Sequence, residues 1–235
     1  MISVIIPTYN EEKNIEKALK QFENQTIGRK NIELIVVDGG SKDGTREIAR
    51  KFADRVIIQT SKGVGGARND GVAVANNHII ATTDADTIIP PDWLERIARN
   101  FEDPRVVGTY GMTKPSDGKW HHKLFYSFLN AFELPFQNIT RIHLPCGSNT
   151  AFRKKEFMEI GGYSDAQVCD DLEIGMRLRK KGKMKGDKKI VVFASTRRYE
   201  KTGLLAPNWL IFKNTLRLIL GRKAGAAAYA RQEYG

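Results

Sequence analysis

The first hundred residues alternate short β-branched runs with longer amphipathic runs, and this alternation constrains the fold more than any other feature. Ile2–Ile6 is a continuous apolar run stopped by Pro7, which is typical of a strand buried on both faces. The next run, Glu11–Asn24, places its apolar residues on one helical stripe. The same two patterns recur and predict strands at Ile32–Val37, Arg55–Gln59 and Ile79–Thr83, and helices at Lys42–Phe52 and Ala67–Asn77. Strands that alternate with helices form a mainly parallel sheet, so we expect an α/β fold.

The second half of the chain departs from this rhythm without a sign of a second independent domain. It has no internal repeat and no linker rich in Pro, Gly or Ser. We therefore expect one domain over residues 1–203 and a basic amphipathic helical extension over residues 204–235, packed on the domain or at a membrane surface. The predicted elements are strands at Val106–Gly111 and Lys189–Ala194, an extended segment at His143–Phe152, and helices at Trp120–Phe136, Asp171–Lys181 and Pro207–Leu220.

The excess positive charge lies in one segment. Residues 176–223 carry 15 Lys and Arg but only 2 acidic residues, whereas residues 1–175 carry 22 basic and 24 acidic residues. Such a block attracts nucleic acid, anionic lipid headgroups or a pyrophosphate group, and charge alone does not choose among them. The overall charge of +11 is thus a local property of the C-terminal part.

Cysteine content and the N-terminus indicate the compartment. The 2 cysteines are too few for a disulfide framework and lack the paired spacing of a zinc site. The N-terminus has no basic region and reaches Pro7 after a short apolar run, unlike a secretory signal or a membrane span. We place the chain in the cytoplasm, with the cytoplasmic face of a membrane as the alternative.

Polar residues follow three of the predicted strands. In a parallel sheet, ligands bind beyond the carboxyl ends of the strands, where these polar segments would meet. A single segment of this kind is usually a helix cap or a turn, but three at one sheet edge favour a binding site. The segments are Pro7-Thr8-Tyr9-Asn10-Glu11, Asp38-Gly39-Gly40-Ser41 and Asp84-Ala85-Asp86.

Asp84 and Asp86 indicate a metal site. In an extended segment, residues two apart project to the same side, which would place two carboxylates where Mg²⁺ or Mn²⁺ could bridge to phosphate oxygens. An Asp-x-Asp pattern is common by chance. Its place after an apolar strand makes this one more specific.

Two further segments carry charged candidates. Gly63–Asn69 lacks the spacing and position of a dinucleotide fingerprint, and we interpret it as a turn leading into a helix whose first turn holds Arg68. Arg68 then faces a diphosphate or is a solvated side chain. Asp170 and Asp171 open another helix, either as favourable charges at its N-terminus or as a close pair in which one carboxylate serves as a general base.

These segments, in this order, resemble glycosyltransferase family 2, the inverting nucleotide-sugar enzymes of the GT-A fold. Ser3–Glu11 is similar to the opening strand and nucleotide-contacting loop of the family, and Ile35–Thr45 to its aspartate loop. The resemblance continues through Ala67-Arg68-Asn69-Asp70-Gly71, Asp84-Ala85-Asp86, Gly147–Arg153, Ile160-Gly161-Gly162-Tyr163 and Asp170–Ile174. Several ordered motifs are more specific than any one of them.

The resemblance implies a role for each matching residue. Asp171 would deprotonate the acceptor hydroxyl, and Asp86 with Asp84 would hold a divalent metal, Mn²⁺ or Mg²⁺. Residues on the acceptor side would be Gly147, Asn149 and Asp170. The residues that would bind the nucleotide sugar are Pro7, Thr8, Asn10, Glu11, Asp38, Arg68, Asp84, Arg197 and Arg198, the last two as diphosphate clamps or as part of a solvated basic face.

The chain departs from the family pattern at two motif positions. Asp170 stands where Glu is more frequent, and Gly39 stands where Asp is common. No histidine follows His143, so a C-terminal histidine ligand for the metal, used by some related enzymes, is absent. The departures at Asp170 and Gly39 leave the identity of the acceptor undetermined.

The expected partners are a nucleotide-sugar donor, UDP- or GDP-linked, and a glycan or lipid-linked acceptor. Leu204–Leu220 is apolar but contains Lys213 and Arg217, so it is too short and too charged for a membrane span and could instead lie at a membrane interface or pack on the core. The rival hypotheses are a sugar nucleotidyltransferase and a non-catalytic nucleic-acid-binding protein that uses residues 176–223. The second explains the charge but not the acidic motifs, so we expect no nucleic-acid partner.

Overall fold

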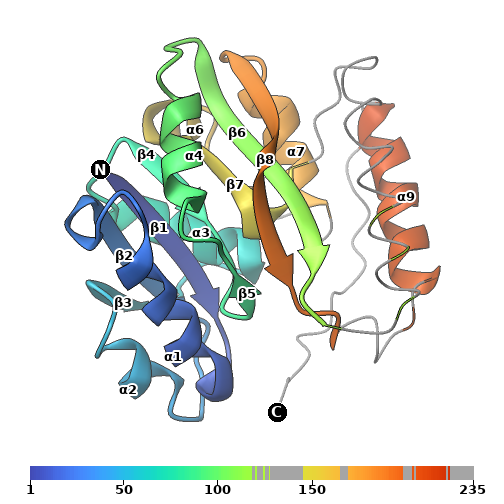
Figure 1. Cartoon of the computed structure of the whole chain (residues 1–235). Coiled ribbons are helices and arrows are strands. Elements are labelled where there is room, and N and C mark those ends of the chain that lie inside the picture. The colour runs from blue at the N-terminus through green and yellow to red at the C-terminus, as the bar shows by residue number, and fades with distance from the viewer. Residues whose placement is uncertain are drawn as a thin grey trace.

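The computed structural model describes residues 1–117, 145–164, 169–197 and 205–220, together with residues 120, 124, 127, 203 and 222. The strands in these ranges are β1 (Ile2–Thr8), β2 (Ile32–Asp38), β3 (Arg55–Ile58), β4 (Ile79–Thr82), β5 (Thr87–Ile88), β6 (Val106–Pro115), β7 (Thr150–Arg153) and β8 (Lys183–Ala194). They form one sheet in the order β3-β2-β1-β4-β7-β6-β8-β5 (Figure 1).

The sheet is mainly parallel, as the alternation of strands and helices predicts. β1 pairs in parallel with both β2 and β4, and β2 pairs in parallel with β3. β7 runs antiparallel between β4 and β6, while β6 and β8 are parallel to each other. The short β5 closes the far edge antiparallel to the end of β8. The carboxyl ends of β1, β2 and β4 therefore meet at one edge.

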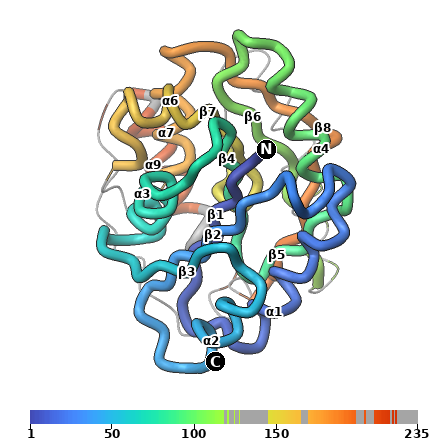
Figure 2. Tube along the Cα trace, turned by 90° about the vertical axis from the view of Figure 1, so that its left-hand side faces the viewer, coloured from blue at the N-terminus to red at the C-terminus, as the bar shows by residue number. Residues whose placement is uncertain are grey.

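Helices cover both faces of the sheet. The helices are α1 (Glu12–Lys20), α2 (Thr45–Ala49), α3 (Gly63–Val74), α4 (Trp93–Asn100), α6 (Lys154–Glu159), α7 (Asp170–Leu178) and α9 (Leu205–Ile219), with short 3₁₀ turns η1 (Gln21–Asn24), η2 (Arg29–Asn31) and η3 (Gly147–Asn149). In Figure 2, α1 and α4 lie on one side of the strands, and α3, α6 and α7 lie on the other.

The core is divided by the sheet into two apolar layers, because successive strand residues point to opposite faces. Val4 and Ile6 of β1 pack in the layer that contains Ile15 of α1 and Trp93 of α4. Ile5, between them, packs in the other layer with side chains of α3, α6 and α7. The continuous apolar run at the start of the chain is thus a strand buried on both faces, as predicted.

Several element boundaries differ from the sequence prediction. The helix predicted at Lys42–Phe52 shortens to α2, because Asp43 accepts hydrogen bonds from the backbone N–H groups of Glu12 and Thr45 and holds the preceding loop. β8 begins at Lys183, well before the predicted Lys189. The predicted helix Trp120–Phe136 lies outside the described residues except at three positions, and the division at residues 203 and 204 stays a prediction.

The glycine-rich segment is the start of α3 and not a turn. A Cβ atom at Gly71 would lie 2.5 Å from Ile5 Cγ2, and one at Gly66 would lie 2.8 Å from Ser61 Cβ. Glycine at these positions lets α3 pack closely against β1 and the loop after β3. The prediction that Arg68 belongs to the first turn was therefore wrong, since the helix begins at Gly63.

Candidate functional site

The ends of β1 and β2 form the first wall of the site. Thr8 and Asp38 are register partners at the last position of these strands. Asp38 is completely buried, and its Oδ2 atom accepts hydrogen bonds from the backbone N–H groups of Gly40 (3.1 Å) and Ser41 (3.0 Å). Arg46 of α2 lies 3.5 Å from the same oxygen.

Two polar atoms of this wall have no partner. Asp38 Oδ1 and Thr8 Oγ1 are buried and have no hydrogen-bond partner in the described part of the chain. A buried polar atom without a partner is costly, so such atoms in a loop cluster suggest a ligand that supplies the missing hydrogen bond. Both residues were predicted to contact the nucleotide.

The loop after β1 is tied to the loop after β2. Asn10 adopts a left-handed backbone conformation (φ 52°), in which its N–H donates to Ser41 Oγ (2.9 Å) and its Oδ1 accepts from the N–H of Lys42 (2.9 Å). Glu11 N–H donates to Thr45 Oγ1 (2.8 Å). These bonds fix both loops, including the predicted residues Pro7, Asn10 and Glu11, at the sheet edge.

The Asp84-Ala85-Asp86 segment follows β4 at the same edge. Asp86 Oδ2 lies 3.0 Å from Arg197 Nη2, and the same guanidinium nitrogen lies 3.3 Å from Glu11 Oε1. Burial and the neighbouring Asp84 raise the pKa of Asp86, while Arg197 opposes the rise. Residues far apart in the sequence, which were all predicted on the donor side, therefore meet here.

Arg68 of α3 is the centre of the site. Its side chain is only 4% exposed, and its Nη1 atom lies 3.1 Å from Asp171 Oδ1 and 3.7 Å from Asp170 Oδ2, while Nη2 lies 3.2 Å from Asp84 Oδ1. One guanidinium thus joins the segment after β4 to the start of α7. Its charge offsets the mutual repulsion of three carboxylates that lie within 3.7 Å of its guanidinium.

Gly147 and Tyr163 complete the surroundings of Arg68. A Cβ atom on Gly147 would lie 2.2 Å from Arg68 Nη2, so only glycine fits at this position. The Gly147 N–H donates to Asp171 Oδ2 (2.8 Å), and the Arg68 guanidinium carbon lies 5.6 Å from the centroid of the Tyr163 ring. Arg68 is therefore held on all sides by packing and charge.

Asp171 has the properties of a general base. Burial and the adjacent Asp170 raise the pKa of Asp171 to about 7, against the opposing effect of Arg68 and of the Gly147 N–H. Its side chain is still 23% exposed, compared with 12% for Asp170. A reachable carboxylate that titrates near neutral pH suits proton abstraction from a hydroxyl.

The structure bears on the predicted roles of Arg68 and Asn149. Arg68 is not a solvated side chain, because it is only 4% exposed and carboxylates surround its guanidinium. Its role at the diphosphate stays a prediction. Asn149 is fully buried, and its amide bonds Trp93 Nε1 (2.9 Å) and the carbonyl oxygen of Met112 (2.9 Å). Its side chain is thus part of the frame of the site, and its place on the acceptor side stays a prediction. Arg198 lies outside the described residues.

Sequence reasoning missed Tyr163 and Asp117. Tyr163 lies in a segment that matched the family, but nothing in its spacing predicts a position against Arg68. Asp117, after β6, accepts hydrogen bonds from Ser195 Oγ (2.9 Å) and from the backbone N–H of Thr196 (2.7 Å) and so fixes the segment that carries Arg197. This contact joins the ends of two strands that are distant in the sequence.

The two carboxylates of Asp84 and Asp86 fit a divalent cation whose remaining coordination positions are filled by a bound ligand and water. Within the described ranges, no group of three or more His, Cys, Asp or Glu side chains is arranged to hold a metal, and both cysteines are free thiols. Asp84 and Asp86 are each partly exposed and offer carboxylate oxygens. Mg²⁺ and similar ions are commonly held by one or two carboxylates together with substrate phosphates and water, which agrees with this arrangement.

The mainly parallel sheet with carboxylates gathered beyond β1, β2 and β4 is that of the GT-A class of nucleotide-sugar enzymes. The family model described as glycosyl transferase family 2 matches residues 3–161. The chain therefore belongs to glycosyl transferase family 2.

Individual matches include a curated glycosyltransferase and solved structures of similar fold. The chain is 42% identical over 101 residues to glycosyltransferase AglE of Haloferax volcanii, a match that covers 40% of this chain and 33% of that protein. It superposes with a TM-score of 0.71 and 24% identity on mannosyltransferase PcManGT from Pyrobaculum calidifontis in complex with GDP-Man and Mn²⁺, over 95% of this chain and 65% of that one. Glucosyl-3-phosphoglycerate synthase from Mycobacterium tuberculosis, in complex with Mn²⁺, UDP and phosphoglyceric acid, matches with a TM-score of 0.69 and 18% identity over 94% of this chain and 79% of that one.

The matches cover only part of the length of several curated relatives. The chain spans about a third of the length of AglE and of two further curated relatives that it matches. None of the described helices combines the length and apolar character of a membrane span.

Proposed function

We propose that this chain transfers a sugar from a UDP- or GDP-linked donor to an acceptor hydroxyl with inversion at the anomeric carbon. The observation that carries the proposal is the sharing of Arg68 between Asp84, on the donor side, and Asp171, the carboxylate with the raised pKa. A donor held at the first position and a base at the second lie one guanidinium apart. Holding the donor and the acceptor in one fixed arrangement makes the transfer an effectively unimolecular step.

Each wall of the site has a task in this reaction. Asp38 Oδ1 and Thr8 Oγ1 supply unpaired polar atoms for the nucleobase. Asp86 with Asp84 would hold Mn²⁺ or Mg²⁺, which when bound neutralises the charge that builds on the departing diphosphate. Asp171 removes the proton of the acceptor hydroxyl as that oxygen attacks, and Arg68 keeps the base oriented. The acceptor oxygen forms its bond to the anomeric carbon as the bond to the nucleoside diphosphate breaks on the opposite face, so the carbon inverts in one step.

Nucleoside diphosphate release tests this function. The purified chain is incubated with a panel of UDP- and GDP-sugars and Mn²⁺ or Mg²⁺, with water as the default acceptor. We expect donors with one particular nucleobase and one particular sugar to give metal-dependent release of the nucleoside diphosphate. The rate of release should fall by about 10²–10⁴-fold in Asp171→Asn, the range for loss of a general base. Asp86→Ala should also abolish the metal-dependent release, whereas Asp92→Asn, at the exposed start of α4, serves as a matched control.

The product separates the rival classes. A sugar nucleotidyltransferase releases pyrophosphate and not a nucleoside diphosphate. Absence of release and of nucleotide binding, together with salt-sensitive RNA or DNA binding that survives Asp171→Asn, would favour the nucleic-acid-binding alternative.

We also propose that the acceptor side of the enzyme works at an anionic membrane, on a glycan or a lipid-linked glycan. The observation is the orientation of α9. Trp209 and Phe212 are 66% and 59% exposed, with their rings stacked at 5.8 Å, whereas Asn214 is only 2% exposed. An ordinary surface helix turns its apolar side inward, so the exposed face of α9 suits an apolar surface.

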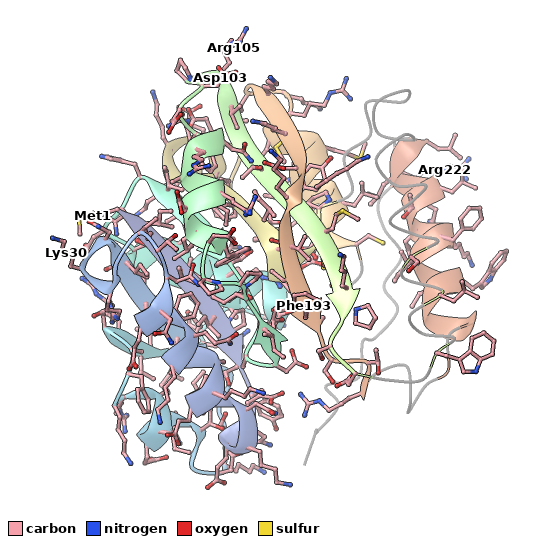
Figure 3. All side chains as sticks on the ribbon, viewed as in Figure 1. Met1, Lys30, Asp103, Arg105, Phe193 and Arg222 are labelled. Carbon is pink, nitrogen blue, oxygen red and sulfur yellow. The ribbon has the colours of Figure 1, made fainter. Side chains whose placement is uncertain are left out.

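The positive charges on α9 favour an anionic surface. Lys213 and Arg217 are exposed on α9 beside the aromatic residues, and the surrounding segment carries the basic excess. In Figure 3, a row of α9 side chains lies on the side of the helix that faces away from the sheet, and Arg222 is labelled near one end of the helix. Aromatic and aliphatic side chains flanked by cations are typical of helices that lie in the interface of anionic bilayers.

Vesicle flotation tests the membrane contact. Wild type should float with vesicles that contain an anionic phospholipid and not with neutral vesicles, and the exposed pair Trp209→Ser with Phe212→Ser should remove the binding. Met158→Ser is the matched control, because Met158 is an exposed apolar residue on α6. A protein that stays unbound and is dimeric by light scattering, with the double variant monomeric, would instead assign this face to a second copy of the chain.

A further inference from the structure

Arg197 lies between two carboxylates on the donor side of the site. Its Nη2 atom is 3.0 Å from Asp86 Oδ2 and 3.3 Å from Glu11 Oε1. The side chains of Arg197 and Asp86 are each 31% exposed, while that of Glu11 is 10% exposed. The guanidinium therefore supplies positive charge directly at the carboxylate that was assigned to the metal.

Both sides of this ion pair are anchored. Asp117 accepts hydrogen bonds from Ser195 and Thr196, the two residues before Arg197. On the other side, Glu11 Oε2 accepts from Asn14 Nδ2 (2.6 Å). The position of the guanidinium is thus built into two loops and is more than the chance placement of a long surface side chain.

A guanidinium and a divalent cation compete for Asp86. A divalent ion such as Mg²⁺ binds a carboxylate oxygen at about 2.0–2.1 Å, and two cations that share one carboxylate oxygen repel each other strongly in a partly buried place. Glu11, in contrast, stays available to Arg197 whatever happens at Asp86. The geometry therefore offers Arg197 two states, one paired with both carboxylates and one paired with Glu11 but not with Asp86.

We propose that Arg197 is an exchangeable counter-ion of Asp86. In the free enzyme it neutralises Asp86, and on donor binding it leaves Asp86, stays with Glu11 and turns the N–H group released from Asp86 to the diphosphate. This rests on the proposed function, because the second state needs a nucleoside diphosphate. The consequence is that the free enzyme binds a divalent ion weakly and binds it well only together with the nucleotide.

Metal binding without nucleotide is the decisive measurement. Free Mn²⁺ is counted by electron paramagnetic resonance in titrations of wild type, Arg197→Gln, Arg197→Lys and the control Arg99→Gln. Arg99 is an exposed arginine that pairs with Glu95 on α4, so its variant removes the same charge far from the site. We expect Arg197→Gln to bind Mn²⁺ about three- to tenfold more tightly than wild type, the range for loss of a partly exposed ion pair, with the lysine variant close to wild type.

Arg197→Gln should have the opposite effect on nucleotide affinity, which it lowers. By calorimetry in saturating Mn²⁺, Arg197→Gln should bind UDP or GDP about tenfold more weakly, because the N–H group to the diphosphate is lost. Unchanged or weaker Mn²⁺ binding by Arg197→Gln, or tighter binding in Arg99→Gln to the same degree, overturns the exchange. Unchanged nucleotide affinity overturns the transfer to the diphosphate. Wild type that binds no nucleoside diphosphate at all contradicts the proposed function itself, whatever the Mn²⁺ titrations show.

Discussion

Burial and neighbouring charges together set the pKa of Asp171. It needs to be ionised to accept a proton, yet burial and Asp170 favour its protonated form. Arg68 and the Gly147 N–H limit this effect and keep the pKa near neutral. A base in this range is available near neutral pH without being fully ionised, which is the condition for efficient proton transfer.

The pH profile should show this residue directly. The donor hydrolysis rate of wild type should rise as pH increases through about 7 and level off above it, because only the carboxylate form of Asp171 acts as a base. The residual rate of Asp171→Asn should lack this rise. A wild-type profile that is flat between pH 5 and 9, with binding unchanged, would contradict the assignment of the base.

The raised pKa also predicts a stability difference with a definite sign. A carboxyl whose pKa is higher in the folded than in the unfolded state destabilises the fold when it ionises, so its cost is absent at low pH and complete above the folded pKa. Asp171→Asn should therefore be more stable than wild type at pH 8, and the difference should shrink toward pH 4. Urea unfolding at both pH values measures it, and an equal difference at both would count against the raised pKa.

Gly147→Ala should damage the site through Arg68. The new Cβ atom would overlap the guanidinium, so we expect a loss of about 1–3 kcal/mol in the free energy of unfolding and a lower turnover number. In the background of Arg68→Ala the same substitution should cost much less, because the overlapping atoms are gone. A double-mutant cycle by urea unfolding checks this coupling, and additive losses would mean that Gly147 acts elsewhere.

At the scale of elements, Asn149 joins three parts of the fold. Its amide bonds the indole of Trp93 in α4 and the carbonyl oxygens of Met112 in β6 and Ile190 in β8. Asn149→Leu should leave these groups buried and unpaired, and we expect a loss of about 2–4 kcal/mol in the free energy of unfolding. Nucleotide affinity measured well below the melting temperature should change little, whereas a large specific loss of acceptor affinity would restore the role predicted from the sequence.

Local patterns predicted the elements that are locally determined. The apolar run of β1 and the stripe of α1 follow from periodicity because burial on known faces imposes it. The start of β8 could not be found, because Lys183–Lys189 has a charged, unpatterned sequence at the edge of the sheet, where β5 pairs only with Phe193 and Ala194. Lysine at such an edge discourages pairing with other chains and hides the strand from a hydrophobic pattern.

The site was predicted in its parts but not in its connections. Positions after strands located Asp38, Asp84 and Asp86, because a parallel sheet gathers its carboxyl ends. The contact between Arg68 and Asp171 spans 103 residues and depends on where α3 and α7 pack, which no local spacing specifies. Asn149 was assigned to the acceptor because its motif matched, although burial gives it a structural task.

At the scale of the whole molecule, donor binding should stabilise the fold. Ligand that binds only the folded state adds about 2.7 kcal/mol at a hundred times the dissociation constant, which corresponds to a rise of roughly 5–10 °C in melting temperature for a chain of this size. We expect this rise for the cognate UDP or GDP with Mn²⁺ and a much smaller one after EDTA. Equal rises for all nucleotides, with or without metal, would show binding without donor recognition.

The sharing of Arg68 by three carboxylates restricts how this protein can diverge. If Asp84 becomes neutral, Arg68 keeps a charge that fewer partners balance, and if Arg68 is lost, the acids repel one another. A larger residue at Gly147 is excluded for as long as the arginine remains. Among descendants of a common ancestor these positions should therefore change as a set, and a lineage that replaces one of them should carry a compensating replacement at another.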